Sequence, residues 1–305
     1  MSDAALERQL KAPNGYRLDN TYRSLAMGQF DPSMRTSREQ VEIASWTPHG
    51  PVSVRAVHSY DTLSVSAWGD GAEYAIELAD RWLGLNDQPD AFQPPAGPVR
   101  DLQRRFGGMH FSSALSVSLR AIQIVLFQLV TYHEAVRTWN DLVTRHGSPA
   151  SGPVKLVQPP TEHQIRGLSV DDLVYAGLTH KRARTIKAIA TNAAAIDRDA
   201  DKSPQAALRR LATLPGFGPW SLGYLDGTVF QNPDAVLLGD YHLPRMVAWH
   251  LIREQKADDA RMLELLEPYA GHRFRVVRLI WASGEIQPRR GPRMTPRARL
   301  SFRDV

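Results

Sequence analysis

One short segment constrains the fold of this chain more than any other. Residues 211–221 read Leu-Ala-Thr-Leu-Pro-Gly-Phe-Gly-Pro-Trp-Ser. An apolar helical pattern precedes Pro215 and Gly216 and must end there, because proline cannot continue a helix and glycine commonly closes one. A second helix is predicted to open at Ser221, with apolar residues facing inward. Two helices therefore meet through a very short turn that contains glycine.

This turn predicts an anion-binding site made from backbone groups. Gly216 and Gly218 permit backbone angles that other residues avoid, and they leave no side chain in the way of a ligand. The N-terminus of the second helix presents unpaired N–H groups, and its dipole favours negative charge. A phosphate could approach closely, and such contacts fix position on a nucleic acid without reading its bases. An ordinary corner between two helices is the alternative interpretation.

A carboxylate follows at the expected start of a later helix. Asp240 stands between Gly239 and Tyr241, and Pro244 is tolerated in the first turn of the helix that follows. An aspartate in this place would cap the helix by accepting hydrogen bonds from its first N–H groups. Capping alone would explain the residue. The functional interpretation is that the cap holds a reactive carboxylate rigidly, within reach of a ligand bound to the glycine turn.

The composition excludes several classes of protein. The 305 residues contain no cysteine, so disulfides, thiolate zinc sites and iron–sulfur clusters are ruled out. No apolar run approaches the roughly 20 residues that a membrane-spanning helix needs. The N-terminal residues also lack the pattern of a secretory signal. We therefore expect a cytoplasmic protein without a membrane partner.

Charge is distributed unevenly along the chain. Residues 1–100 hold 9 Lys and Arg against 13 Asp and Glu, whereas residues 101–305 hold 28 against 19. The net charges are therefore −4 and +9. A basic second part suggests a polyanionic partner, although many basic surfaces bind nothing. The arginine-rich tail after Pro288 could touch phosphates or remain solvated.

Periodicity divides the chain into a small α/β part and a helical part. Residues 52–57 and 63–68 alternate apolar and polar residues, as half-buried strands do, and helical spacing follows over residues 72–83. Prolines and a glycine crowd residues 89–98 and predict a linker, beyond which the pattern is wholly helical. We expect an α+β protein. Its predicted divisions are an N-terminal antiparallel α/β domain at 1–104, an all-α helix–hairpin–helix domain at 105–287 and a basic tail at 288–305.

The combination of motifs resembles a known family. The run Leu-Pro-Gly-Phe-Gly-Pro-Trp ending at Trp220, then Tyr224 and the later Gly-Asp-Tyr around Asp240, is similar to the helix–hairpin–helix DNA glycosylase superfamily. The Gln-Leu-Val stretch at 128–130 and the N-terminal α/β domain make the chain most similar to the 3-methyladenine DNA glycosylase II branch, which is the alkylation-repair type. The resemblance of the helical part covers residues 105–285.

The resemblance implies a role for each matching residue. Asp240 would be the catalytic carboxylate, and Leu129 would fill the space left by an extruded nucleotide. Backbone N–H groups would bind DNA phosphates at Gly216, Gly218 and Ser221. The substrate pocket would be lined by Gln128, Trp220, Tyr224 and Trp281. Backbone carbonyls for a structural Na⁺ or K⁺ would come from Ala212, Leu214 and Phe217.

Two departures from the superfamily narrow the expected activity. Members that also cleave the strand carry a lysine where this chain has Trp220, and no Schiff base can form without that amine. The iron–sulfur branch needs four cysteines. The resemblance therefore implies a monofunctional glycosylase without lyase activity that requires no cofactor. We expect a monomer that acts on damaged double-stranded DNA in the nucleoid.

The expected reaction is the excision of an alkylated purine during base excision repair. The nucleotide must first rotate out of the duplex. Asp240 would then stabilise the positive charge that develops on the sugar and orient the attacking water. An alkylated purine is itself a cation, which aromatic ring faces favour. Three alternatives remain: a glycosylase for oxidised or deaminated bases, a DNA-binding protein without catalysis, and a hydrolase that uses Asp240 with a metal.

Overall fold

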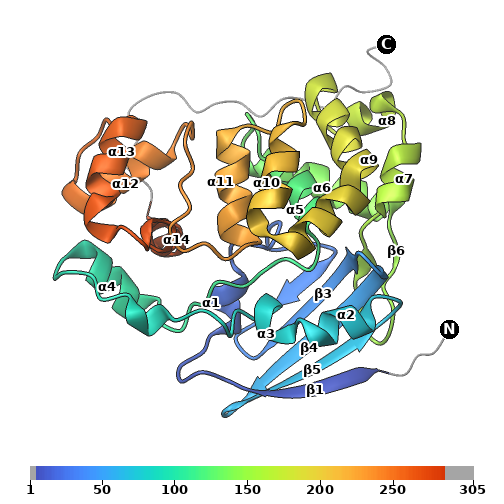
Figure 1. The fold of residues 1–305 in the computed structure, drawn as a ribbon, viewed down its shortest axis with the longest axis horizontal. Helices are drawn as coiled ribbons and strands as arrows, with labels where there is room; N and C mark the ends of the chain where they lie inside the picture. The colour runs from blue at the N-terminus through green and yellow to red at the C-terminus, as the bar shows by residue number, and fades with distance from the viewer. Residues whose placement is uncertain (1–4, 286–305) are drawn as a thin grey trace.

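An antiparallel sheet of five strands forms one side of the molecule, and helices form the other side (Figure 1). The computed structural model describes residues 5–285, so the predicted tail at 288–305 lies outside the described residues. The strand order in the sheet is β1-β5-β4-β3-β2. The strands are β1 (Leu6–Lys11), β2 (Met34–Thr36), β3 (Gln40–Thr47), β4 (Gly50–Ser59) and β5 (Thr62–Trp68).

The two strands predicted at 52–57 and 63–68 are confirmed as β4 and β5, which form an antiparallel pair. Val54 pairs with Ala67, and Ala56 pairs with Val65. These four side chains are buried on one face of the sheet, which packs against the short N-terminal helices. The sequence did not predict β1, β3 or the three-residue strand β2. The first is an edge strand with exposed residues, and the second is buried along almost its whole length, so neither shows a simple alternation.

Helices make up most of the remaining chain. Before the hairpin motif they are α1 (Leu18–Tyr22), α2 (Ala72–Glu77), α3 (Ala79–Trp82), the 3₁₀ turn η1 (Pro89–Ala91), α4 (Pro98–Arg105), α5 (Val117–Leu126), α6 (Tyr132–His146), α7 (Glu162–Gly167), α8 (Val170–Tyr175), α9 (His180–Lys202) and α10 (Pro204–Ala212). After it they are α11 (Pro219–Thr228), α12 (Leu243–Ile252), α13 (Asp259–Leu266), η2 (Glu267–Tyr269) and α14 (Arg273–Ser283). No helix in this part of the chain is both long and apolar enough to cross a membrane.

The sequence predicted a wholly helical second part, and this prediction is wrong because two short strands lie within it. A two-stranded ribbon of β6 (Ser148–Pro149) and β7 (Val157–Gln158) lies between α6 and α7. The ribbon lies beside the main sheet, because β7 contacts β3 and β4. Its neighbours Val154 and Leu156 are buried with Trp68 of β5. The ribbon therefore ties the helical part to the sheet.

The helices form two separate cores. One contains α5, α6, α9 and α10, and the other contains α4, α12, α13 and α14. Figure 1 shows these two groups on either side of α11. Trp220 and Tyr224 of α11 pack against both cores. A site built on α11 therefore lies where two packed units meet.

The proline-rich stretch at 89–98 is not a free linker. Phe92 and Val99 are buried in the core formed by α12–α14, and α4 contacts α12 and α14. Proline at the first position of α4 is compatible with the helix start, so these prolines shape a packed segment. The predicted domain boundary at residue 104 stays a prediction.

The apolar stripe from Ile122 to Val143 is divided between two helices. The chain leaves the helical conformation between α5 and α6, where Leu129 has a positive φ of 54°. Thr131 then starts α6 with a capping box, in which its hydroxyl accepts from the N–H of Glu134 and the Glu134 carboxylate accepts from Thr131. The capping box at Thr131 therefore starts a new helix, although the apolar residues continue with helical spacing from Ile122 to Val143.

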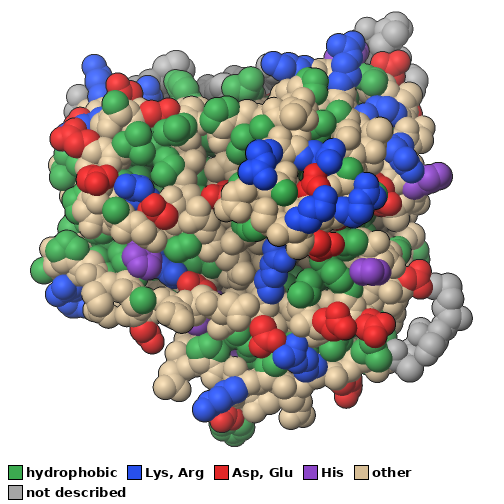
Figure 2. Space-filling view, in the orientation of Figure 1, with side chains coloured by type: hydrophobic (Ala, Val, Ile, Leu, Met, Phe, Trp, Pro, Cys, Tyr) green, Lys and Arg blue, Asp and Glu red, His purple; other side chains and the backbone are tan. Residues whose placement is uncertain are grey.

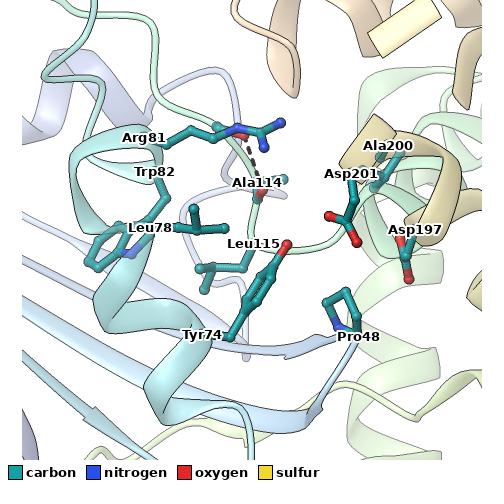
Figure 3. A pocket seen from close by; sticks show the side chains of 12 residues that line it. Pro48, Tyr74, Leu78, Arg81, Trp82, Ala114, Leu115, Asp197, Ala200 and Asp201 are labelled. Carbon is teal, nitrogen blue, oxygen red and sulfur yellow. Dashed lines mark hydrogen bonds between the residues drawn. The ribbon is translucent and has the colours of Figure 1, made fainter. Parts of the chain in front are cut away.

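The buried carboxylate of Asp197 lies on α9, where the helical part meets the sheet and its short helices α1–α3, which together are called the sheet unit. Figure 3 shows Asp197 and Asp201 of α9 across a small cavity from Tyr74 of α2 and Pro48. Asp197 is 7% exposed, and its Oδ2 accepts from the hydroxyl of Ser118 at 3.3 Å. Its Oδ1 has no partner among the residues that the structure describes. Burial raises the pKa of Asp197 to about 6.

Asp197→Asn should stabilise the protein at alkaline pH. The folded-state pKa of Asp197 lies above that of the unfolded chain, so the protonated form favours folding. Its stabilising effect is complete below about pH 4 and is lost as the pH rises through 6. We expect the variant to gain about 1–3 kcal/mol of unfolding free energy at pH 8 and almost nothing at pH 4. Denaturant unfolding at both pH values measures this, with the exposed neighbour Asp201→Asn as control. Equal gains at both pH values would contradict it.

Candidate active site

The predicted hairpin is present between α10 and α11, and Gly216 is required by the chain itself. Its φ is +85°, which other residues rarely adopt. A Cβ at this position would lie 2.5 Å from Oγ1 of Thr185. That hydroxyl donates to the carbonyl of Pro215 at 2.9 Å, which pins the turn against α9. Gly216 therefore fixes the shape of the hairpin.

Gly218 differs from the prediction. Its φ is −95°, which any residue can adopt, and nothing lies within 4 Å of the place a Cβ would take. The fold therefore does not need glycine here. Neither the backbone conformation nor the packing of the protein explains glycine at position 218. Because glycine has no side chain, the space in front of the helix N-terminus stays open, and a ligand from outside could approach closely.

Unpaired donors gather at this hairpin. Within residues 5–285, the backbone N–H groups of Gly216, Gly218 and Ser221 have no acceptor in the protein. Pro219, the first residue of α11, has no N–H, and Leu222 donates to the carbonyl of Gly218 at 3.0 Å. The free N–H groups stand at the positive end of the α11 dipole. The hairpin can therefore hold an anion such as phosphate.

The hairpin also presents carbonyl oxygens. The carbonyl of Leu214 accepts from the N–H of Phe217 at 3.2 Å and keeps a second lone pair. In the part of the chain that the structure describes, the carbonyls of Ala212 and Phe217 accept no hydrogen bond. Free carbonyl oxygens in one turn are suitable ligands for an alkali metal ion, so these residues fit the predicted site.

Gln128 is anchored to the hairpin. Its Nε2 donates to the carbonyl of Gly216 at 2.8 Å and to Oγ of the buried Ser221 at 2.9 Å. The side chain therefore ties the end of α5 to the turn. This is the backbone partnership that a partly buried glutamine requires, and a further role in the pocket stays a prediction.

Leu129 presents an apolar side chain to solvent. It is 95% exposed, although the residues before it in α5 are buried. Its φ of +54° is unfavourable for a residue with a side chain, by about 1–2 kcal/mol. Because Gln128 is bound to the hairpin, its neighbour Leu129 lies beside the unpaired N–H groups of that turn. A strained and exposed leucine next to a candidate ligand site is consistent with the predicted role, in which its side chain fills the space left by an extruded nucleotide.

Asp240 is held at the start of α12 by three donors. Its Oδ1 accepts from the N–H groups of His242 and Leu243 at 2.7 and 2.8 Å. Asp240 therefore binds the first N–H group of α12 as predicted, but the N-cap residue is His242, two residues later. Its Oδ2 accepts from Nε1 of Trp220 at 2.7 Å. The indole therefore connects the helix of the hairpin to the carboxylate. Asp240 is half-buried, so a ligand can still reach it.

Three predicted aromatic residues form one continuous wall. The ring of Tyr224 lies 5.5 Å from that of Trp220 and 5.8 Å from that of Trp281, measured between centroids. The structure thus brings Trp281 of α14 to residues of α11, although these helices are far apart in the sequence. A wall of this kind, ending at Asp240, suits a planar unsaturated ligand.

The sequence analysis did not single out two further aromatic residues at the site. Phe127 lies 6.4 Å from the ring of Tyr224. Tyr241 is 72% exposed, and the guanidinium of Arg245 lies 5.1 Å from its ring. The available signal was their position in the chain, because each directly adjoins a residue that had been selected.

Basic side chains gather on one face of the helical part. Figure 2 shows Lys and Arg over the region of α9 and α10. Exposed examples on α9 and α10 are Lys181, Arg184 and Arg209. This agrees with the positive charge of the second part of the sequence. Among residues 5–285 no group of three or more His, Asp or Glu could hold a metal ion, so the hypothesis of a metal-dependent hydrolase gains no support.

Comparison with solved structures identifies the fold. The 3-methyladenine DNA glycosylase from Archaeoglobus fulgidus aligns with a TM-score of 0.74 at 17% identity, over 90% of this chain and 96% of that one. The structure of MBOgg1 in complex with a low-affinity DNA ligand aligns with a TM-score of 0.70 at 13% identity, over 91% and 95%. The 8-oxoguanine glycosylase/lyase of Clostridium acetobutylicum, in complex with double-stranded DNA, aligns with a TM-score of 0.67 at 9% identity, over 92% and 97%.

No family model and no curated protein sequence matches the chain. The solved structures alone show that the chain shares its fold with these DNA glycosylases, and this fold is α+β, as predicted.

Gly218→Ala should weaken DNA binding while the fold persists. The new methyl group meets no protein atom but occupies the space through which a phosphate would approach. We expect about a tenfold higher Kd, equivalent to about 1.4 kcal/mol, and less than about 1 kcal/mol of lost stability. Fluorescence anisotropy and thermal unfolding measure the two quantities. Gly216→Ala is the contrasting variant. Its alanine would be strained in the folded hairpin, so we expect it to lower both the DNA affinity and the stability of the protein. Unchanged DNA affinity in Gly218→Ala would argue against the phosphate site.

Leu129→Gly should separate stability from activity. Glycine accepts the positive φ without strain, so the unfolding free energy should stay equal or rise by up to about 1 kcal/mol. Base excision should nevertheless fall by about tenfold or more, because nothing then fills the gap in the duplex. Leu129→Met keeps an apolar side chain and serves as control. Full activity in the glycine variant would exclude the wedge.

Proposed function

We propose that the protein is a monofunctional DNA glycosylase that extrudes a damaged nucleotide and hydrolyses its N-glycosidic bond. The supporting observation is the placement of Asp240. Its carboxylate is fixed by the N–H groups of His242 and Leu243 at the start of α12 and by the indole of Trp220, on the helix that follows the hairpin. A binder of DNA without catalysis gains nothing from an additional negative charge beside a polyanion. The carboxylate therefore favours chemistry over binding alone.

The geometry supports a stepwise reaction. The free N–H groups of the hairpin hold a backbone phosphate, and Leu129 enters the space of the rotated nucleotide. The bond between C1′ and the base nitrogen then breaks, and its electron pair leaves with the base. Asp240 stabilises the positive charge that develops on the sugar. The oxygen of a water molecule bonds to C1′, and Asp240 accepts the proton that the water loses.

The absence of lyase activity is part of this proposal. Strand cleavage by a glycosylase requires an amine that attacks C1′. Trp220 occupies the position where strand-cleaving relatives carry lysine, and its indole nitrogen is bound to Asp240. Water is therefore the proposed nucleophile.

The lesion class is the finer part of the proposal. Alkylated purines are the first candidates, because the aromatic wall of Trp220, Tyr224 and Trp281 can stack on an extruded base. One structural neighbour is a 3-methyladenine DNA glycosylase, and another is an 8-oxoguanine glycosylase/lyase. Oxidised or deaminated bases are therefore the alternative substrates.

Several accompanying features are proposed with it. The partner is double-stranded DNA, and the protein acts as a monomer in the cytoplasm, in association with the nucleoid. The carbonyls of Ala212, Leu214 and Phe217 would hold a structural alkali metal ion, which would stiffen the hairpin. No further cofactor is required in this proposal.

Asp240→Asn should abolish base release and leave DNA binding intact. The change removes the charge, and we expect a 10²- to 10⁴-fold slower single-turnover reaction. An amide has only one oxygen. If that oxygen keeps the helix cap, the NH₂ group faces the indole N–H of Trp220. The double variant Asp240→Asn with Trp220→Phe removes this conflict, and Trp220→Phe alone tests the loss of the indole.

The assay measures free bases from duplexes that carry one alkylated, oxidised or deaminated base. The proposal expects Trp220→Phe to retain more activity than either variant that lacks the carboxylate. Near-normal release by Asp240→Asn would refute the role of Asp240. Binding without release of any base, by the unaltered protein, would favour a non-catalytic DNA-binding protein.

A further inference from the structure

A buried guanidinium lies directly behind the aromatic wall. Arg120 of α5 is 1% exposed, and its Cζ lies 5.5 Å from the centre of the Tyr224 ring. Its Nη2 donates to the carbonyl of Ser24 at 2.7 Å, and its Nη1 donates to the carbonyl of Leu25 and to Oε1 of Gln123. All of these acceptors are neutral groups. The charge of Arg120 is therefore solvated by dipoles.

No carboxylate neutralises this charge by direct contact. Among the described residues, Arg120 forms no ion pair within 4 Å. Asp31 is the carboxylate that acts on it through space, and Asp31 is occupied with the N–H of Met27, with Ser33 and with Nε1 of Trp139. Burial lowers the pKa of Arg120, but an arginine stays protonated in proteins at neutral pH.

A second buried arginine adds to the positive charge. Arg278 of α14 precedes Trp281 by one turn and is 4% exposed. It donates to the carbonyls of His110 and Thr21, and burial lowers its pKa to about 10, so it remains charged at neutral pH. Its neighbour Arg275, by contrast, is paired with Asp87 at 2.5 Å.

A structural role explains the hydrogen bonds of both arginines. They hold carbonyls of the segment at 20–25, which comprises the end of α1 and the residues directly after it. Such a clamp positions the sheet unit against the helices. It does not require a charge against the aromatic wall, and its loss should affect every substrate alike. The position of Arg120 against Tyr224 has a further electrostatic consequence.

We propose that the buried charge of Arg120 selects electrically neutral damaged bases over purinium cations. The inference rests on the proposed glycosylase activity and changes the expected order of its lesions, because among alkylated purines it favours only the adducts that remain neutral. The face of an aromatic ring attracts one cation through its quadrupole. At Tyr224 the guanidinium of Arg120 is already the cation beside the ring. A cationic base on the same ring would therefore gain less from the cation–π attraction. Neutral alkyl adducts, oxidised bases and deaminated bases are therefore preferred over N7- or N3-methylpurines.

The charge also acts on bond cleavage. When a neutral base leaves, the electron pair of the C1′–N bond makes it an anion, which then takes a proton from water. Positive charge behind the wall stabilises this developing anion. When a purinium cation leaves, the same electron pair makes it neutral, and Arg120 opposes the cation in the bound state. Arg120 thus acts through Tyr224 as a positioning residue that sets specificity.

The selectivity between lesions tests this proposal. Single-turnover release is measured from duplexes with 7-methylguanine as the cation and with 1,N⁶-ethenoadenine, hypoxanthine and 8-oxoguanine as neutral bases. Each rate is divided by the uncatalysed rate of the same lesion. In Arg120→Met, which removes the charge and keeps an unbranched apolar chain, we expect the ratio of neutral to cationic rates to fall about tenfold. Arg120→Lys should restore the ratio to within about threefold.

A matched variant separates charge from packing. Gln123→Met removes an acceptor of Arg120 and leaves the charge in place, so the ratio should not change even where stability falls. An unchanged ratio in Arg120→Met would reduce Arg120 to a clamp. If Arg120→Met does not fold, the unaltered protein decides the matter, because a preference for 7-methylguanine overturns the proposal. Release of no base from any duplex would instead contradict the glycosylase activity itself.

Discussion

The hydrogen bond from the indole of Trp220 to the carboxylate of Asp240 is the contact on which the whole site depends. Trp220 belongs to the first turn of α11 and therefore moves with the hairpin. Asp240 belongs to the start of α12 and therefore moves with the second helical core. The 2.7 Å contact joins these two units at the short end of the 2.7–3.2 Å range of N–H···O hydrogen bonds. It keeps the hairpin, with its unpaired N–H groups, and a charged side chain in fixed relation, so that a group bound between them would be held in one position.

The local parts of this site could be predicted from the sequence. The hairpin follows from proline and glycine between two helical patterns, and the cap follows from Asp240 before Pro244, because both are decided within a few residues of chain. The contacts between distant segments could not be predicted in this way. The approach of Trp281 to Tyr224, and that of Arg120 to the same ring, depend on how α14 and α5 pack on α11. The stretch at 89–98 was misjudged for a similar reason, since its prolines are visible in the sequence while its burial against α12–α14 is not.

Glycine serves two different purposes in the hairpin. Gly216 has a backbone conformation that side chains avoid, and Thr185 leaves no space for a Cβ. Gly218 has neither constraint, so its absence of a side chain concerns whatever approaches from outside. Leu129 combines the opposite features, because it bears a large side chain on an unfavourable backbone and exposes it fully. An unfavourable backbone conformation and an exposed apolar side chain both lower the stability of the free protein. Their occurrence at one exposed residue is best explained by a bound partner.

Identification of the products formed from a duplex with one damaged base is the most direct test of the central claim. Mass spectrometry would follow the base, gel electrophoresis would follow the strand, and borohydride would trap any covalent intermediate. The account predicts that the protein releases the intact damaged base, leaves an unbroken strand with an abasic site and forms no trapped complex. Strand cleavage with a borohydride-trapped adduct, or tight binding without a released base, would contradict hydrolysis directed by Asp240.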